Sequence, residues 1–303
     1  MSGSTTAPFR FFSVTVSRLE DLTPSIRRLT LTGPDLERFG DPGWDQRIKL
    51  VLPSPTAGYD RLPTGEGWYR QWLALPEELR PPIRTYTTRA VRRRAREVDI
   101  DVVLHGPSGP AGRWVQAARP GSRAVLLGPD AGHEGDPGGV DFVPPRVTER
   151  FLLGGDETAA PAISRILEDL PPSARGVAVV ELPTRADVDY LPTHPGFEMR
   201  ILSREGRSHG ELLVNGVRAA AAELCPPGAP QEVEEIDVDR DLLWEVPRTA
   251  KGGAALKRTT LYAWLAGEAG AVRAMRRHLV AERGIDRRSV AFMGYWRLGR
   301  PEG

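Results

Sequence analysis

The chain has 303 residues, so we expect two domains, each large enough to bury its own core. Its formal net charge of +1 excludes a dedicated nucleic-acid-binding protein with a basic surface. The single Cys225 excludes a disulfide framework or a four-thiolate metal site, and the five histidines lack metal-ligand spacing. With no signal core and no membrane span of about 20 apolar residues, we expect a cytoplasmic protein without stable membrane insertion.

The first half of the chain is typical of β structure. Short apolar runs at 9–16, 26–32, 47–52 and 97–104 are separated by proline and glycine. This spacing predicts a small barrel. The aperiodic stretch 129–148 predicts a long loop, and we place the domain boundary between residues 145 and 146.

The second half, residues 146–303, alternates strands with helices, which is typical of a parallel sheet. Strands are expected at 151–153, 177–182, 199–202, 260–265 and 290–296, and helices at 158–170, 211–224 and 269–283. Two domains therefore follow one another, a barrel over 1–145 and an open α/β domain over 146–303.

Residues 226–258 interrupt this alternation. Their acidic run, between Glu232 and Asp241, predicts a solvated loop insertion. The alternative is a flap over a cofactor, with Leu242, Leu243 and Trp244 as its apolar anchor.

The segment Arg84-Thr85-Tyr86-Thr87 offers a cation, an aromatic ring and hydroxyls along one extended stretch. A guanidinium grips phosphate with two parallel hydrogen bonds, so Arg84 suits the pyrophosphate of a flavin dinucleotide. Tyr86 shares its strand face and is expected to stack on the isoalloxazine, with Thr87 near N5. The alternative is an ordinary barrel strand with a surface arginine.

About twenty residues later, the run HGPSGPAGRW at 105–114 consists mostly of small residues. Gly109 to Gly112 open a predicted short helix whose amides favour an anion, and residues without bulky side chains let a pyrophosphate approach. The alternative is a surface turn. Two further glycine-containing turns, GDETA at 155–159 and WLAGE at 264–268, follow predicted strands at the edge where open α/β sheets bind ligands.

In the order RTYT, HG with GPA and Trp114, GDETA, WLAGE and the closing Gly294-Tyr295-Trp296-Arg297, these motifs resemble the siderophore-interacting proteins. These are FAD-dependent ferric-siderophore reductases of the ferredoxin-NADP reductase-like superfamily. The resemblance implies a six-stranded antiparallel FAD-binding β-barrel, a C-terminal α/β parallel-sheet NAD(P)H-binding domain, and reduction of Fe(III) held in a siderophore. The chain departs from the family pattern at 130–141 and 226–258. These departures affect the expected substrate entrance more than the cofactor site.

The resemblance also implies the site residues. Tyr86 and Thr87 are the expected catalytic residues. FAD is expected to contact Arg84, Thr85, Tyr86, Thr87, Val103, His105, Gly106, Gly109, Pro110, Ala111, Gly112, Trp114, Asp156, Thr158, Ala159 and Trp296. The nicotinamide donor is expected to contact Gly155, Arg185, Ser203, Arg204, Ala266, Gly267 and Glu268. We interpret Ser203, Arg204 and Arg185 as 2′-phosphate ligands, which favours NADPH over NADH.

For the anionic ferric siderophore, the resemblance implies a basic pocket, for which Lys49, Lys257, Arg258 and Arg297 are the candidates. The arginines at 92–94 and 96 are interpreted as an exposed hairpin tip. No protein-bound metal is expected, and a monomer is the default. Two other functions stay open: a flavin reductase serving a ferredoxin-like carrier, and a non-catalytic flavin- or siderophore-binding protein.

Overall fold

A computed structural model describes residues 6–106, 109–226, 228, 243–249 and 252–299 of the chain. The described residues form two compact units, which divide between Gly139 and Val140. The segment between the last strand of the first unit and the first strand of the second contains both this division and the boundary expected from the sequence.

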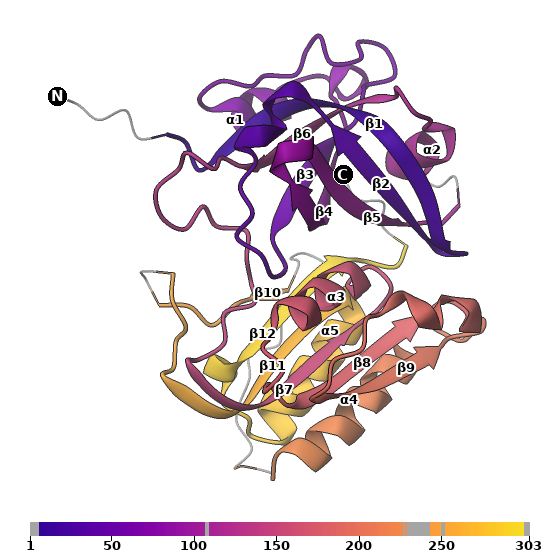
Figure 1. Ribbon diagram of the computed structural model, residues 1–303. Coiled ribbons are helices and arrows are strands. Elements are labelled where there is room, and N and C mark those ends of the chain that lie inside the picture. The colour runs from indigo at the N-terminus through magenta and orange to yellow at the C-terminus, as the bar shows by residue number, and fades with distance from the viewer. Residues whose placement is uncertain (1–5, 107–108, 227, 229–242, 250–251, 300–303) are drawn as a thin grey trace, which may run out of the picture. The chain divides into compact units, whose positions relative to one another are not determined.

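The first unit is a closed barrel of six antiparallel strands in the order β1-β2-β5-β4-β3-β6 (Figure 1). Its strands are β1 Phe9–Thr23, β2 Ile26–Thr32, β3 Arg47–Val51, β4 Ile83–Arg92, β5 Glu97–Val103 and β6 Arg123–Pro129. Alternate residues such as Phe12, Val14 and Val16 of β1 point into one apolar core, which is why these alternating runs close into a barrel. The predicted N-terminal barrel is confirmed.

The first unit also contains short helices. They are α1 Trp68–Leu73, α2 Gly109–Ala117 and the 3-10 turns Pro34–Arg38, Glu77–Leu79 and Arg93–Ala95. The last of these forms the tip of the β4–β5 hairpin, as predicted for the arginine cluster. Arg92 is not simply solvated there, because its guanidinium pairs with Glu97 and with the buried Asp99.

The second unit contains a six-stranded sheet in the order β10-β12-β11-β7-β8-β9. Its strands are β7 Val147–Gly155, β8 Gly176–Leu182, β9 Phe197–Ser203, β10 Trp244–Glu245, β11 Arg258–Glu268 and β12 Val290–Trp296. All neighbours pair in parallel except β10 and β12. The α/β domain is confirmed, and the sheet is mixed rather than purely parallel because β10 adds an antiparallel edge.

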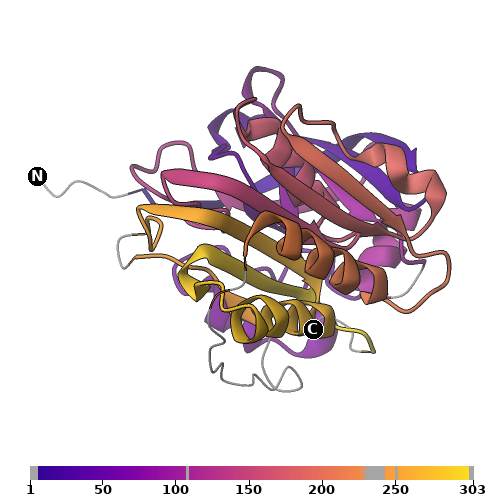
Figure 2. The ribbon, with the colours of Figure 1, turned by 90° about the horizontal axis from the view of Figure 1, so that it is seen from below.

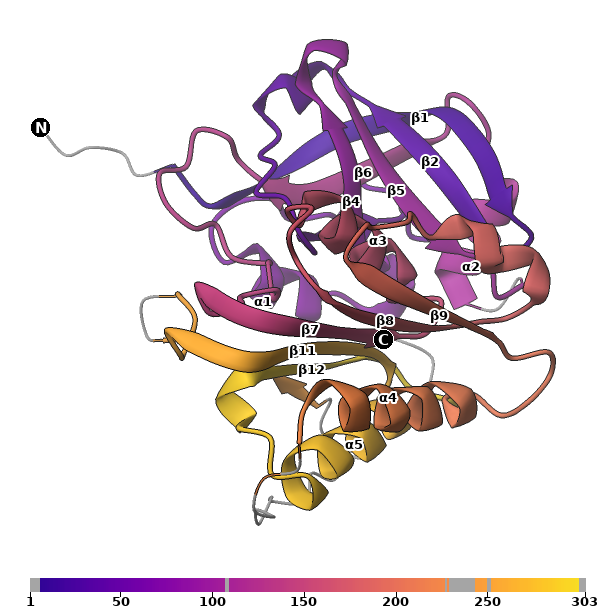
Figure 3. The ribbon, with the colours of Figure 1, turned by 60° about the horizontal axis from the view of Figure 1, so that its bottom comes forward.

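Helices cover both faces of this sheet, with α3 on one face and α4 and α5 side by side on the other (Figures 2 and 3). The helices are α3 Ala160–Asp169, α4 Glu211–Leu224, α5 Ala269–Arg276 with a π-helical continuation at Arg277–Glu282, and the 3-10 turns Arg185–Tyr190 and Arg287–Ser289. Among the described residues, no helix has the length and apolarity needed to cross a membrane.

The described part of the interruption at 226–258 includes residues that pack on the sheet. Leu243 is buried in the core of the second unit, and Trp244 stacks on Tyr295 of β12 with ring centroids 5.7 Å apart. These two residues therefore anchor the segment to the sheet. Leu242 and the acidic run lie outside the described residues.

Candidate functional site

Strand β4 places the side chains of the RTYT motif on two faces. Arg84 pairs with Leu50 and Tyr86 with Ile48 of β3, so these two motif residues share one face. Tyr86 packs against the apolar core of the barrel and is only partly buried. Arg84 is half-buried, and its Nη1 donates to the carbonyl of Ile83 at 2.8 Å. The cation and the ring therefore lie two residues apart on one face, as predicted.

The other face of β4 carries Thr85, which pairs with Lys49. The Lys49 Nζ donates to the Thr85 hydroxyl oxygen at 2.7 Å. Lys49 thus lies on the face of this sheet opposite Tyr86, and the structure does not bring it to the ring of Tyr86. Thr87 follows on the same face as Thr85 but is buried.

The end of β5 leads into a turn in which backbone geometry requires glycine. Val103 ends the strand, His105 is exposed, and Gly106 and Gly109 have φ of 76° and 71°. A methyl group added at either glycine would meet no described atom within 4 Å. Helix α2 then begins at Gly109, and the first amides of a helix have no acceptor within the helix.

This turn fits the pyrophosphate of a flavin dinucleotide. Glycines that face open space let a ligand approach the backbone, and the following helix N-terminus favours negative charge. Pro110 and Gly112 keep the first turn of the helix free of long side chains. Ala111 and Trp114 pack against the barrel core, so Trp114 anchors the helix and does not lie loose on the surface.

In the second unit, most of the predicted nicotinamide residues gather at one edge of the sheet. The parallel strands β7, β8, β9, β11 and β12 all end there, and we call it the carboxyl edge. The turns that follow these strands contain Asp156, Arg185, Arg204, Glu268 and Arg297.

Asp156 is the centre of the carboxyl edge. It is 2% exposed, and its carboxylate accepts four hydrogen bonds. Thr158 donates its amide at 2.9 Å and its hydroxyl at 2.5 Å, the Glu268 amide donates at 2.7 Å, and the Trp296 Nε1 donates at 2.8 Å. Burial, with the nearby Glu157 carboxylate as a second cause, raises the pKa of Asp156 to about 6.

The glycines of this edge are packed by the protein itself. A Cβ on Gly155 would lie 2.5 Å from the Cβ of Ala159, and a Cβ on Gly267 would lie 2.6 Å from Asp156 Oδ2. Because Asp156 accepts the Thr158 amide at the start of α3, the protein supplies the anion there. The amides of Thr158 and Ala159 in the GDETA turn, which both bond to Asp156, are therefore not free for a dinucleotide phosphate as the sequence predicted.

Arg204 differs most from its expected role. It is 7% exposed, and its two terminal nitrogens donate to both oxygens of Glu157 at 2.9 and 3.0 Å. A third bond, at 3.0 Å, reaches the buried Glu181, whose carboxylate also accepts the amides of Gly210 and Leu213 at the start of α4. This buried ion pair network occupies the guanidinium, so we leave Arg204 out of the proposed phosphate contacts.

A pocket of about 820 Å³ lies beside the network at the ends of β8 and β9. Two exposed cations line it, Arg185 and Arg207, together with Ser203 and Glu205. The Glu205 carboxylate accepts the amide of Arg185 at 2.6 Å. Apolar walls complete the pocket through Val188, Ile201, Leu202 and Leu212. The sequence predicted Arg185 and Ser203 here and missed Arg207, which lies in the same loop as Arg204.

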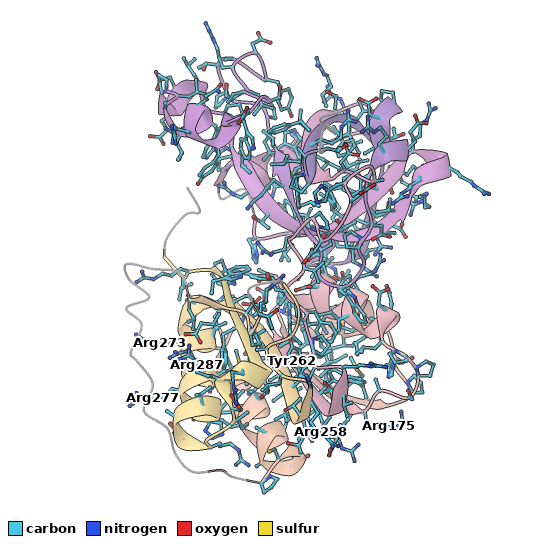
Figure 4. The ribbon with its side chains drawn as sticks, turned by 90° about the vertical axis from the view of Figure 1, so that its left-hand side faces the viewer. Arg175, Arg258, Tyr262, Arg273, Arg277 and Arg287 are labelled. Carbon is cyan, nitrogen blue, oxygen red and sulfur yellow. The ribbon has the colours of Figure 1, made fainter. Side chains whose placement is uncertain are left out.

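Lys257 and Arg258 lie at the opposite end of the sheet. Arg258 begins β11 and Glu268 ends it, so about 33 Å of strand separates Arg258 from the carboxyl edge. Figure 4 shows Arg258 at the same end of the sheet as Arg175, which directly precedes β8, so this is the edge where the strands begin. We therefore leave Lys257 and Arg258 out of the proposed substrate contacts, whereas Arg297 follows β12 at the carboxyl edge.

Two further features were missed by the sequence analysis. His209 lies with its ring against that of Trp296, with centroids 5.0 Å apart and planes at 82°. Glu181 is the one charged residue of the otherwise apolar strand β8. A carboxylate in such a strand indicates that a buried cation pairs with it. Among the described residues, no group of three His, Cys, Asp or Glu side chains is arranged to hold a metal ion.

A barrel with a flavin-type turn and an α/β sheet with a cationic pocket at its carboxyl edge define a class of flavoproteins that take electrons from a nicotinamide dinucleotide. Within that class, residues 15–133 match the model of the siderophore-interacting FAD-binding domain, and residues 148–299 match that of the siderophore-interacting protein. The chain belongs to the siderophore-interacting protein family.

Individual relatives agree with this assignment. The ferric vibriobactin reductase of Vibrio cholerae is 30% identical over 94% of this chain and 89% of its own length. The NADPH-dependent ferric-chelate reductase of Escherichia coli is 32% identical over 65% of this chain and 72% of its own length. The crystal structure of a siderophore utilization protein from T. fusca superposes with a TM-score of 0.71 at 28% identity, covering 97% of this chain and 95% of that one.

Proposed function

We propose that this protein is an FAD-dependent reductase that transfers electrons from NADPH to Fe(III) held in a siderophore. The observation that carries the proposal is the barrel turn, where Gly106 and Gly109 leave open space beside the α2 N-terminus, on the unit that also presents Arg84 and Tyr86. The relatives named as ferric vibriobactin reductase and NADPH-dependent ferric-chelate reductase support the same reaction here.

The chemistry requires an intermediary between donor and acceptor. A nicotinamide gives up two electrons as a hydride, whereas each Fe(III) accepts one. When bound, FAD supplies this conversion, because it accepts the hydride and releases electrons singly. Siderophore oxygens are hard ligands that hold Fe(III) better than Fe(II), so reduction weakens the complex and frees the iron.

The barrel residues have separate parts in this proposal. The Arg84 guanidinium binds the pyrophosphate, together with the amides that open α2. Tyr86, whose ring is fixed against the barrel core, stacks on the isoalloxazine. The half-buried positions of Arg84 and Tyr86 limit the access of water to the site, and Thr87, buried on the opposite face of β4, is left out of the proposed flavin contacts.

The pocket at the ends of β8 and β9 supports NADPH as the donor. Arg185 and Arg207 provide two guanidinium groups for a 2′-phosphate, and Ser203 provides a hydroxyl. The one carboxylate of the pocket, on Glu205, is hydrogen-bonded to the Arg185 amide. A 2′-phosphate therefore meets two cations and one anion already engaged with the backbone, which favours NADPH over NADH.

For the acceptor, we propose an anionic ferric siderophore bound near Arg297. We further propose that the enzyme works as a monomer in the cytoplasm, where reduced nicotinamide is supplied. A ferredoxin-like carrier remains the alternative acceptor, and the test below separates the two.

The test is anaerobic and uses the purified, FAD-loaded protein. NADPH should bleach the visible flavin band, and a ferric siderophore added next should restore it while a ferrous chelator develops colour. Hydroxamate, catecholate and citrate complexes are tried in turn, with oxidised ferredoxin as the rival acceptor. Bleaching without any ferrous product from the three chelate classes would refute the siderophore proposal.

A further inference from the structure

Asp156 lies at the end of β7 and joins three neighbouring strands of the sheet. Its Oδ1 accepts both donors of Thr158, in the β7–α3 turn. Its Oδ2 accepts the Glu268 amide at the end of β11 and the Trp296 Nε1 at the end of β12. Since β12, β11 and β7 are consecutive in the sheet, one carboxylate fixes the ends of all three.

All four groups facing this carboxylate are hydrogen-bond donors, and three of them are N–H groups that cannot accept. An asparagine at this position would direct its NH₂ group at donors on whichever side it took. The site therefore requires two acceptor oxygens, which an ionised carboxylate provides and an amide of the same size does not.

The surroundings make this carboxylate unfavourable for stability. Glu157 carries a second buried carboxylate beside it, Arg204 is committed to Glu157 and Glu181, and Glu268 adds another acid at the same edge. His209 packs against the ring of Trp296, whose Nε1 donates to this carboxylate. A buried charge of this kind is retained where it fixes a geometry that an apolar or amide side chain would not.

Contacts with Asp156 and His209 help to place the Trp296 ring. Asp156 holds its N–H, and His209, from the loop before α4, packs edge-on against it. Gly267 contributes on the same side, because its φ of 140° and lack of a Cβ leave room for Asp156 Oδ2. The indole is thus placed by loops from three strand ends.

We propose that Asp156 is a positioning residue of the nicotinamide site, whose carboxylate places the Trp296 ring and the Gly267–Glu268 turn to receive the nicotinamide end of NADPH. Asp156 acts through these groups and does not touch the cofactor. This inference rests on the proposed function, because it assigns the carboxyl edge to the electron donor.

The test compares Asp156→Asn with Trp296→Phe, which keeps an aromatic ring but loses the N–H. In the FAD-loaded protein, Asp156→Asn should slow flavin reduction by NADPH about tenfold. Oxidation of photoreduced flavin by ferric siderophore should keep its wild-type rate. The double variant should be no slower than the slower single variant, because both changes break one link. Asp141→Asn, which alters another buried aspartate in the same unit, paired with Arg248, should leave both half-reactions unchanged.

A second readout does not depend on activity. The seven tryptophans are labelled with fluorotryptophan, and the fluorine NMR signal of Trp296 is assigned by its loss in Trp296→Phe. Asp156→Asn should shift or broaden this signal, and Asp141→Asn should not. An unchanged Trp296 signal in Asp156→Asn overturns the inference, as does an equal slowing by Asp141→Asn.

The two proposals fail in different ways. Wild-type protein that does not oxidise NADPH contradicts the proposed function, while the NMR comparison still decides whether Asp156 places Trp296. If Asp156→Asn does not fold, Trp296→Phe tests the link from the donor side, and an unchanged rate of flavin reduction by NADPH in that variant refutes the inference.

Discussion

Glycine serves different purposes in the turn of the barrel and in the turns of the sheet. In the barrel, Gly106 and Gly109 adopt positive φ, and an added methyl group at either would enter open space. At the carboxyl edge of the sheet, an added Cβ on Gly155 or Gly267 would lie within 2.6 Å of Ala159 or Asp156. The absence of side chains in the barrel turn leaves room for a ligand, whereas in the sheet turns it leaves room for the protein's own groups.

The difference shows which turn suits a phosphate. The barrel turn has space and a helix start, whereas the Asp156 carboxylate already occupies the amide of Thr158 at the start of α3. The cations available for the donor's phosphate lie instead at the ends of β8 and β9, on Arg185 and Arg207. The proposed phosphate site of the sheet is therefore a pocket of side chains rather than a loop of amides.

The largest expected effect is on the barrel site. Arg84→Ala removes the charge-assisted hydrogen bonds proposed for the FAD pyrophosphate, so bound flavin should fall below about a tenth of wild type. The flavin content of the purified protein measures this. Arg94→Ala removes an exposed arginine at the hairpin tip and should keep its FAD. Full occupancy in the Arg84 variant would refute the role of Arg84.

The next effect concerns the buried network of the sheet. Arg204→Met leaves Glu157 and Glu181 buried without their cation, which should lower the free energy of unfolding by about 3–5 kcal/mol. Urea denaturation measures the change. Arg200→Met, which breaks pairs with the exposed Glu198 and Glu223, should cost less than about 1 kcal/mol. Equal losses of unfolding free energy in the two variants would show that the buried network stabilises the protein no more than the exposed ion pairs do.

A smaller effect is the pH dependence caused by Asp156. Its pKa is raised from an ordinary value near 3.8 to about 6, so the folded protein binds this proton more tightly than the unfolded chain does. Protonation of Asp156 contributes its full stabilisation of the fold below pH 4, and this stabilisation is lost as pH rises to about 6. The unfolding free energy of wild type minus that of Asp156→Asn should fall by roughly 2 kcal/mol over this range. A constant difference would contradict the raised pKa.

The smallest effect concerns the choice of donor. Arg207→Gln and Arg185→Gln should each raise the KM for NADPH about tenfold, since each removes one charge-assisted contact with the 2′-phosphate. The KM for NADH should stay the same, because NADH lacks that phosphate. Steady-state assays with both donors measure this. Arg204→Lys, which keeps a buried cation outside the pocket, serves as the comparison and should leave the KM for both donors at the wild-type values.

The sequence was most informative where a site is local. The barrel motifs lie on one strand and one turn, so their spacing alone predicted that Arg84 and Tyr86 share a face. At the sheet, the sequence predicted a phosphate contact for Arg204. The partners of Arg204 in the structure, Glu157 and Glu181, are 47 and 23 residues away in the sequence. Long-range pairing of this kind is not visible in the local pattern.

Other differences could have been anticipated. Lys257 and Arg258 precede a predicted strand, so the direction of the strand already placed them at the edge opposite the carboxyl ends. The interruption at 226–258 contained Leu243 and Trp244, which pack on the sheet as an added antiparallel edge. The acidic residues of this segment led to the prediction of a solvated loop, although the apolar residues indicated packing on the protein. Arg207 was missed because nothing in the sequence distinguishes it from the other arginines of the chain.

The central claim is that this protein converts hydride equivalents from NADPH into single electrons for siderophore iron. The most direct measurement is anaerobic electron counting with catalytic amounts of the FAD-loaded protein, a limiting amount of NADPH and excess ferric siderophore with a ferrous trap. The account predicts two ferrous ions for each NADPH consumed, and no ferrous product from Arg84→Ala protein that lacks FAD. Consumption of NADPH without ferrous iron, or ferrous iron formed equally well without flavin, would contradict it.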